Sequence, residues 1–296
     1  MKEEDLSLLL SLLKDKIQPS PYGRERIGVN HGLHFTGGEP FLNFPLLLKA
    51  VERAKEENIP SLFVETNAFW AREDEETFKK MKLLKEKGLH GILVSVNPFI
   101  AEYVPFERTQ RAVEIGYEVF KENLVVYQWE YFVLFKNWGL KGRLPWEEYI
   151  RRDKIRGELL LMGIAVYKLP VLRKYNSSQF YGTCYSELIR FWHNHWDNYG
   201  NILPGFCAGI SLGNWKENPQ IYEEGINLES YPLLKILLEE GVRGLLDWAK
   251  RKFHFREKGD YSSPCHLCLE IRKFLVEKRE IFPELAPLQY YFLLEE

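Results

Sequence analysis

The chain has 296 residues, and its 40 basic and 42 acidic side chains leave a formal net charge of −2. We therefore predict no nucleic-acid partner, because proteins that bind nucleic acids gather excess basic charge on one face. No apolar run reaches the roughly 18 residues of a membrane span, and the Leu-rich stretch at 6–13 lacks the basic start and cleavage site of a signal peptide. We expect a cytoplasmic protein with no membrane partner. Abundant Lys and Glu with few Met and Cys also favour a thermophilic source.

The first part of the chain alternates between helical and extended patterns. Residues 5–17 carry Leu at helical spacing, and a break rich in Pro, Gly and Ser follows. In chain order we then expect strands at 32–36, 61–66, 92–96 and 124–128, separated by helices at 43–57, 73–87 and 106–121. This repetition indicates βαβ units and a parallel sheet, and we expect a partial (β/α) TIM-like barrel in an α/β domain of residues 1–165.

After about residue 165 the repeat ends, and residues 166–296 are predicted to form a small cysteine-rich α+β domain. This domain contains the four cysteines of the chain, Cys184, Cys207, Cys265 and Cys268. Cys265 and Cys268 form a C-x-x-C motif in front of a predicted helix at 269–278, and Cys207 follows a predicted hairpin from Trp192 to Phe206. Four thiolates suit one Zn²⁺ ion or one iron–sulfur cluster, and the alternative is a set of buried cysteines with no ligand.

The same hairpin carries His193, His195 and Asp197, which strand alternation places on one face. They could line a substrate or donate hydrogen bonds to the metal ligands, and ordinary packing of a polar hairpin is the alternative. His266, inside the C-x-x-C motif, is expected to face solvent.

A Gly37-Gly38-Glu39-Pro40 loop follows the predicted strand that ends at Thr36. Ligands of parallel α/β proteins bind at the carboxyl ends of the strands, and two glycines allow positive φ and a close approach of the backbone to a ligand. Exposed carbonyl groups and the Glu39 carboxylate could accept hydrogen bonds from an ammonium group. A tight turn with no ligand is the alternative.

The segment His34–Leu42 resembles the GGEP segment of radical S-adenosylmethionine (radical SAM) enzymes. The resemblance implies that Gly37, Gly38, Glu39 and Pro40 hold the methionyl amino group of SAM. The strand end Val64-Glu65-Thr66-Asn67 is similar to the family's TNG strand end, with Ala68 in place of Gly, and this adds Thr66 and Asn67 to the cofactor site. Ser95 and Asn97 match the strand end that contacts the ribose or carboxylate of SAM, with Asn97 in place of a common Asp.

The C-terminal domain resembles the SPASM/twitch extensions of the same family. The matching features are Cys184, Gly200, Cys207, the Leu212-Gly213-Asn214 segment, and the pair Cys265 and Cys268. The resemblance implies one auxiliary [4Fe–4S] cluster on the four cysteines, with Zn²⁺ as the alternative occupant.

Radical SAM enzymes also carry a Cys-x-x-x-Cys-x-x-Cys loop after their first barrel strand, and residues 1–36 contain no cysteine. We expect that strand and loop to be missing here. The free edge of the sheet would then be covered by the N-terminal helix, a partner chain or a second copy.

Two functions follow from the resemblance. If an upstream segment supplies the loop, the chain is a radical SAM enzyme that generates a 5′-deoxyadenosyl radical and modifies an unidentified small-molecule or peptide substrate. The alternative is a degenerate, non-catalytic binding or scaffold protein with a structural metal. No catalytic residue is assigned.

Overall fold

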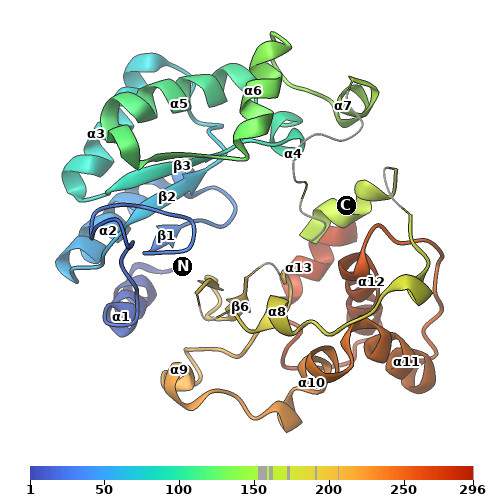
Figure 1. Ribbon diagram of the computed structural model, residues 1–296. Helices are drawn as coiled ribbons and strands as arrows, with labels where there is room; N and C mark the ends of the chain where they lie inside the picture. The colour runs from blue at the N-terminus through green and yellow to red at the C-terminus, as the bar shows by residue number, and fades with distance from the viewer. Residues whose placement is uncertain (153–158, 160–162, 172–173, 191, 206, 296) are drawn as a thin grey trace. The chain divides into compact units, whose positions relative to one another are not determined.

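The chain forms two compact units, Met1–Leu159 and Leu160–Glu296 (Figure 1). This computed structural model describes residues 1–152, 159, 163–171, 174–190, 192–205 and 207–295. Among these residues, no helix combines the length and the apolar character that crossing a membrane requires.

The N-terminal unit is built on a four-stranded parallel sheet. Its strands are β1 (His34–Phe35), β2 (Phe63–Thr66), β3 (Gly91–Ser95) and β4 (Leu124–Tyr127), and they lie side by side in that order. The parallel sheet and its four strands confirm the sequence prediction. The order never reverses, whereas a doubly wound sheet reverses at its switch point. The sheet is open among the described residues, so no closed barrel forms there.

Helices follow the strands with the predicted alternation (Figure 1). The helices of this unit are α1 (Glu3–Leu13), α2 (Phe44–Glu56), α3 (Asp74–Lys87), α4 (Pro98–Ala101), α5 (Phe106–Phe120), α6 (Trp129–Asn137) and α7 (Trp146–Arg152). Helix α3 packs between α2 and α5. It ends where Gly88 adopts φ +118°, a left-handed conformation that favours glycine. Helix α1 is shorter than predicted, because the buried leucine stripe stops at Leu13.

Short 3₁₀ helices occur in both units. They are η1 (Pro40–Asn43), η2 (Lys121–Asn123), η3 (Gly163–Tyr167), η4 (Leu169–Val171), η5 (Ser177–Gln179), η6 (Leu228–Ser230) and η7 (Leu293–Glu295).

The core of the N-terminal unit lies between this sheet and its helices. Strand β3 is buried along its whole length, as expected for a parallel strand covered on both faces. The fully buried side chains of this core include Val51, Val64, Met81, Ile92, Val94 and Ala112. Burying a side chain of the size of Met or Ile contributes roughly 1.5–3 kcal/mol, so these contacts hold the helices against the strands.

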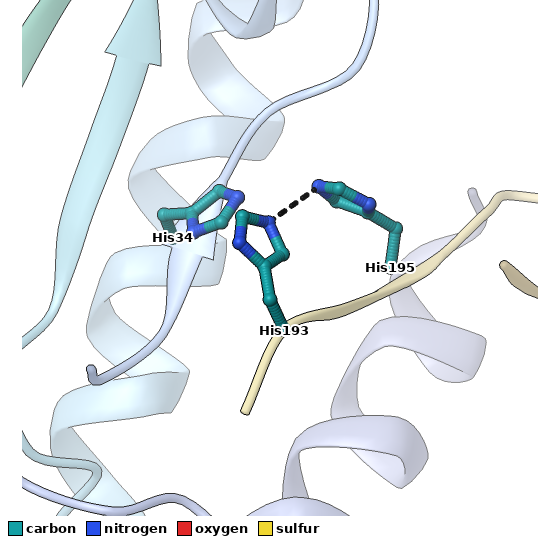
Figure 2. Close-up of side chains that lie close together, drawn as sticks. All are labelled: His34, His193 and His195. Carbon is teal, nitrogen blue, oxygen red and sulfur yellow. Dashed lines mark hydrogen bonds between the residues drawn. The ribbon is translucent and has the colours of Figure 1, made fainter. Parts of the chain in front are cut away.

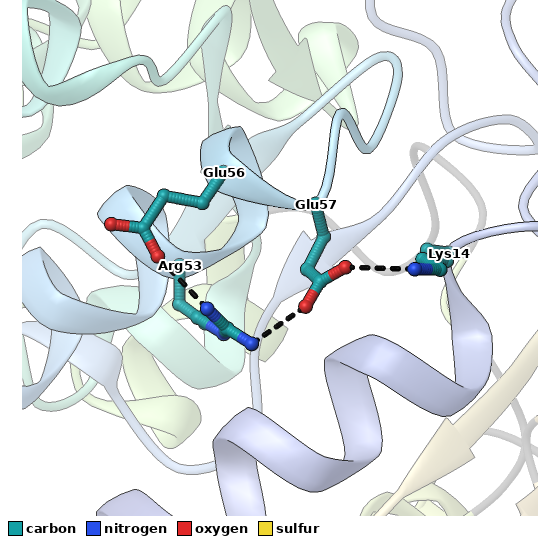
Figure 3. Close-up of polar contacts among 4 residues, drawn as sticks. All are labelled: Lys14, Arg53, Glu56 and Glu57. Atoms are coloured by element: carbon teal, nitrogen blue, oxygen red, sulfur yellow. Dashed lines mark hydrogen bonds and ion pairs between the residues drawn. The ribbon is translucent and has the colours of Figure 1, made fainter.

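A group of charged side chains joins the end of α1 to the end of α2 (Figure 3). Lys14 Nζ lies 3.2 Å from Glu57 Oε2, and Arg53 bridges Glu57 Oε1 at 2.7 Å and Glu56 Oε2 at 3.0 Å. The Glu57 side chain is 11% exposed, whereas that of Glu56 is 64% exposed. Exposed ion pairs contribute little, so Glu57 is the carboxylate that stabilises this junction.

The imidazole of His90 caps the start of β2. Its Nδ1 accepts a hydrogen bond of 2.9 Å from the N–H group of Leu62, a residue that is 1% exposed. Burial lowers the pKa of His90, and Arg24 lowers it further although Glu25 opposes the shift. The neutral imidazole is therefore part of the folded state.

We predict that His90 makes the N-terminal unit less stable in mild acid. Above about pH 6.5, His90 is neutral in both the folded and the unfolded state. Below that pH the unfolded chain takes up a proton that the folded state binds less readily, so the free energy of unfolding decreases as the pH is lowered. His90→Asn keeps an acceptor that does not titrate, so its urea midpoint should change less between pH 7.5 and pH 5.5 than that of the wild type. His90→Ala should lose about 1–3 kcal/mol at pH 7.5, because the Leu62 N–H is left unpaired. Equal pH dependence of wild type and His90→Asn would rule this role out.

The C-terminal unit combines one antiparallel hairpin with a group of helices. Strands β5 (Asn194–Trp196) and β6 (Ile202–Pro204) form the predicted hairpin. The helices are α8 (Tyr185–Leu188), α9 (Ile221–Glu224), α10 (Pro232–Glu239), α11 (Gly241–Phe253), α12 (Pro264–Glu277) and α13 (Leu288–Phe292). Helix α11 packs against α10 and α12 around a core that includes Leu237, Leu245, Leu246, Leu267, Ile271 and Leu275.

The C-x-x-C motif lies inside a helix rather than in front of one, which corrects the predicted start at residue 269. Helix α12 begins at Pro264, which tolerates the first helical position because its missing N–H needs no partner there. The Ser263 hydroxyl caps it by accepting a hydrogen bond from the N–H of His266 at 3.2 Å. Cys265 and Cys268 therefore lie in the first turns of α12.

Candidate functional site

The Gly37-Gly38 turn presents an open stretch of backbone at the carboxyl end of β1. Gly37 and Gly38 have φ of +84° and +59°, and a Cβ atom built on either would meet nothing within 4 Å. Both residues are exposed, and no backbone hydrogen bond involves them within the described part of the chain. The turn therefore offers unpaired backbone groups with space for a ligand in front of them.

Glu39 points away from that open space. It is 7% exposed, and its carboxylate accepts hydrogen bonds from Thr66 Oγ1 at 2.8 Å and from the N–H groups of Asn67 and Phe41 at 2.8 and 3.2 Å. Burial raises the pKa of Glu39, these hydrogen bonds lower it, and the nearby Glu65 carboxylate raises it. The sequence suggested this carboxylate as an acceptor for an ammonium group. In the structure it instead fastens the loop to the end of β2 and caps η1, which begins at Pro40.

Thr66 is the centre of a buried hydrogen-bond network at the end of β2. Its Oγ1 donates to Glu39 and accepts from the N–H of Ala68 at 3.0 Å and from Trp70 Nε1 at 2.9 Å. The Trp70 ring stacks on Phe41 with centroids 3.8 Å apart. Ala68 has φ +65°, in the left-handed region, which is a physical reason for a glycine at the equivalent TNG position. Asn67 Oδ1 accepts from the N–H of Phe69 at 2.9 Å and shapes the same turn.

A carboxylate that the sequence analysis did not single out joins three strand ends. Glu65 on β2 accepts hydrogen bonds from Thr36 Oγ1, after β1, at 3.0 Å and from Ser95 Oγ, on β3, at 2.8 Å. An acidic residue inside the apolar run 61–66 was the available signal for its role. Ser95 thus shares Glu65 with Thr36, and its hydroxyl hydrogen is directed to that carboxylate.

Asn97 extends the connected strand ends to β4. Its Oδ1 accepts from the N–H of Ile100 at 3.0 Å and caps α4, and its Nδ2 donates to Gln128 Oε1 at 3.0 Å. Gln128 follows β4 with φ +65°. The eight residues predicted for the cofactor therefore gather at one edge of the sheet, although their polar side chains already bind other groups of the protein.

The four cysteines of the C-terminal unit come from three separate segments. Cys184 precedes α8, and its N–H donates to the carbonyl of Leu237 at the end of α10 at 2.9 Å. Cys207 lies just after β6, in a turn in which its N–H donates to the carbonyl of Pro204 at 2.9 Å. Cys265 and Cys268 lie on α12, and all four thiols are free.

These thiols are neighbours, because the charge on one thiol changes the pKa of another. Burial raises the pKa of Cys184 to about 12, with further increases from Cys268 and Cys265. Burial also raises the pKa of Cys265 to about 11, again with Cys268 contributing, and raises that of Cys207. A ligand that binds here must therefore displace protons from the thiols, as metal sites made of cysteine do.

Four neighbouring thiols can hold either a single metal ion or an iron–sulfur cluster. Among the described residues, no three of the four sulfur atoms lie within 4.8 Å of one another. Four sulfur ligands at about 2.3 Å from one tetrahedral Zn²⁺ would lie roughly 4 Å or less apart. A [4Fe–4S] cluster binds each thiolate through a different iron atom and spreads the sulfurs wider. The donor set of four thiols therefore fits either occupant.

The predicted hairpin forms beside Cys207. Gly200 in its turn has φ +101°, a left-handed conformation that favours glycine, and a Cβ there would lie 2.4 Å from Asn214 Oδ1. The Leu212-Gly213-Asn214 segment runs next to β6, where Gly213 and Leu212 exchange backbone hydrogen bonds with Ile202 at 2.9 and 2.7 Å.

The polar residues of the hairpin have different roles. Figure 2 shows His193 and His195, whose Nε2 atoms lie 3.2 Å apart, with His34 of β1 also drawn. Burial, helped by His195 and Arg190, lowers the pKa of His193 to about 4, so it is neutral at pH 7. Asp197 is a turn residue instead, because its carboxylate accepts from the N–H groups of Tyr199 and Asn201 at 2.8 and 2.9 Å.

His266 is buried, at 8% exposure, and does not face solvent as the sequence suggested. Its Nδ1 accepts from the N–H of Ser262 at 3.1 Å, and its ring lies edge-on to Tyr167 and Tyr261. The imidazole turns inward because the helix has already begun at Pro264, so position 266 faces the core.

Comparison with known protein families gives one match. Residues 16–106 match the family described as a 4Fe-4S single cluster domain. The matched segment covers β1 to β3 and the Gly37-Gly38 turn, and it contains none of the four cysteines. No curated protein matches the chain. The N-terminal unit is therefore similar to an iron–sulfur family, whereas the thiols that could bind a cluster belong to the C-terminal unit.

Proposed function

We propose that this chain is a radical SAM-type protein that binds SAM and a [4Fe–4S] cluster. The cluster is held in the C-terminal unit by Cys184, Cys207, Cys265 and Cys268. The observation that carries this proposal is the convergence of four cysteines from three segments, whose charges act on one another. The family match over residues 16–106 supports it independently.

The SAM site lies at the carboxyl edge of β1 to β4. The unpaired backbone groups of Gly37 and Gly38 bind the amino end of SAM, and the polar strand ends at Thr66, Asn67, Ser95 and Asn97 shape the surrounding surface. Glu39 and Pro40 hold the turn in place rather than contacting the ligand, since the Glu39 carboxylate is already bound from three sides.

Binding of SAM and its cleavage to a radical require different groups. A cluster ligated by four thiolates has no open iron site, so this one stores or relays electrons and does not itself cleave SAM. Cleavage in this family uses a Cys-x-x-x-Cys-x-x-Cys loop, and residues 1–296 contain no such motif. We therefore propose formation of a 5′-deoxyadenosyl radical only in the presence of such a loop.

The test combines metal analysis with calorimetry on anaerobically purified protein. We expect about four iron and four sulfide per chain, together with measurable heat on titration with SAM. Zinc without iron or sulfide would overturn the cluster assignment and favour a structural metal in a binding or scaffold protein. Absence of binding heat would overturn the SAM assignment.

Gly38→Val tests the position of the SAM site. It should weaken SAM binding about tenfold or more, an effect of about 1.4 kcal/mol or more, because a side chain would occupy the open space. Gly139→Val is the matched control: Gly139 also has φ +59° and open space around its Cβ, so both variants carry the same backbone strain. Equal affinity of the two variants for SAM would place the ligand elsewhere.

A further inference from the structure

One face of α12 carries a buried cation beside the cysteines. Cys265, Cys268 and Arg272 follow one another at spacings of three and four residues, which places them on one face of the helix. Arg272 is only 5% exposed. A buried cation costs several kcal/mol unless negative charge or hydrogen bonds compensate it, so its neighbours decide its role.

Part of the guanidinium is used to hold the turn that carries Cys207. Arg272 Nη1 donates to the carbonyl of Ala208 at 2.9 Å and to Tyr291 Oη at 2.8 Å. Tyr291 Oη in turn donates to the carbonyl of Gly209. These contacts fasten the residues that follow Cys207 to α12, and they involve no carboxylate.

The guanidinium belongs to a side chain on the same helix face as Cys265 and Cys268. Arg272 Nε is buried and has no hydrogen-bond partner among the described residues. Burial by itself disfavours the charged guanidinium, but Tyr291, Cys268, Tyr290 and Cys207 outweigh it and raise the pKa of Arg272. Arg272 in turn lowers the pKa values of Cys207 and Cys265. The hydrogen bonds of Arg272 Nη1 go to neutral oxygens, and the neighbouring cysteines become anionic only when they bind a metal or cluster.

A second unpaired donor lies at the same place. Tyr290 Oη is buried without a hydrogen-bond partner, and the charges of Arg272 and Cys268 both act on it. Its ring is fixed against Gly209, where a Cβ would come within 2.4 Å of Tyr290 Cδ1. Arg272 Nε and Tyr290 Oη are thus two buried donors that could bind a metal or cluster held by the four cysteines.

We propose that Arg272 and Tyr290 donate hydrogen bonds to the sulfur atoms of the cluster on Cys184, Cys207, Cys265 and Cys268, and so raise its reduction potential. This inference rests on the proposed function. Reduction adds one electron, supplied by a low-potential one-electron donor, and no bond to the thiolates forms or breaks. A fixed positive charge and hydrogen bonds to sulfur both stabilise the added negative charge, so the reduced form gains more than the oxidised form.

The test is an anaerobic redox titration of the full-length protein with dithionite, followed by electron paramagnetic resonance. Arg272→Gln should disfavour reduction at least about tenfold, a shift of the midpoint potential of about 59 mV to lower values for a one-electron couple. Tyr290→Phe should shift it in the same direction by a smaller amount. Arg272→Lys keeps the charge and should recover part of the shift. Arg251→Gln removes an exposed arginine of α11 and should leave the potential unchanged.

The iron content tests the proposed function, whereas the midpoint potential tests the role of the two donors. Absence of iron in the wild type would refute the proposed function itself. Full iron content with an unchanged midpoint potential in both Arg272→Gln and Tyr290→Phe would refute only the role of these donors. If Arg272→Gln fails to bind iron because the Cys207 turn loosens, Tyr290→Phe decides alone, since it removes a hydroxyl that has no hydrogen-bond partner among the described residues.

Discussion

Replacing Cys268 by serine is expected to reduce the bound iron and sulfide of anaerobically purified protein to less than about a tenth of the wild-type content. Cys268 is 7% exposed, and its charge acts on the other three thiols as well as on Arg272 and Tyr290. Serine has nearly the same volume, but its hydroxyl is a poor ligand for cluster iron, which selects soft thiolates.

The same substitution should also destabilise the C-terminal unit. Metal binding by a folded site adds its free energy to folding, and for structural zinc sites that contribution reaches roughly 10–16 kcal/mol. The variant should therefore melt at a clearly lower temperature than the wild type, with the visible absorption of the cluster lost. Tyr185→Phe, at an exposed position beside Cys184, is the control and should retain full iron content. Wild-type iron content in Cys268→Ser would remove Cys268 from the ligand set.

Thr66→Val should destabilise the N-terminal unit by about 4 kcal/mol, because three buried groups lose a partner; two of them are then unpaired, at about 1–3 kcal/mol each, while Glu39 Oε1 keeps the Phe41 N–H. The three groups are Glu39 Oε1, the N–H of Ala68 and Trp70 Nε1. Valine matches the volume of threonine, so the loss reports the hydroxyl and not a cavity. Urea unfolding, localised by hydrogen exchange of peptides from residues 61–70, measures the effect.

Two further substitutions control this result. Thr66→Ser keeps the hydroxyl and should cost much less than Thr66→Val. Thr36→Val removes one exposed hydrogen bond, to Glu65, and should cost less than about 1 kcal/mol. If Thr66→Val and Thr36→Val destabilise the protein equally, the buried network does not hold the strand ends together.

The sequence by itself determined the regular elements of the N-terminal unit. Apolar runs such as 92–96 and amphipathic stretches such as 43–57 differ in period, and period is a local property that needs no tertiary information. The same holds for the hairpin of β5 and β6, whose turn contains a glycine at a positive φ. The sequence also predicts the four cysteines as candidate ligands, because the C-x-x-C motif places two thiols within reach of one ligand.

Only the tertiary structure decided how the side chains at the strand ends are used. Thr36 and Ser95 lie 29 and 30 residues from Glu65 in the chain, and the register of three parallel strands brings them together. The same packing turned Glu39 inward, where it anchors the Gly37-Gly38 turn. In the C-terminal unit, the start of α12 at Pro264 buried His266 and set Arg272 on the face of the cysteines. These outcomes depend on contacts between distant segments, which a local pattern of residues does not encode.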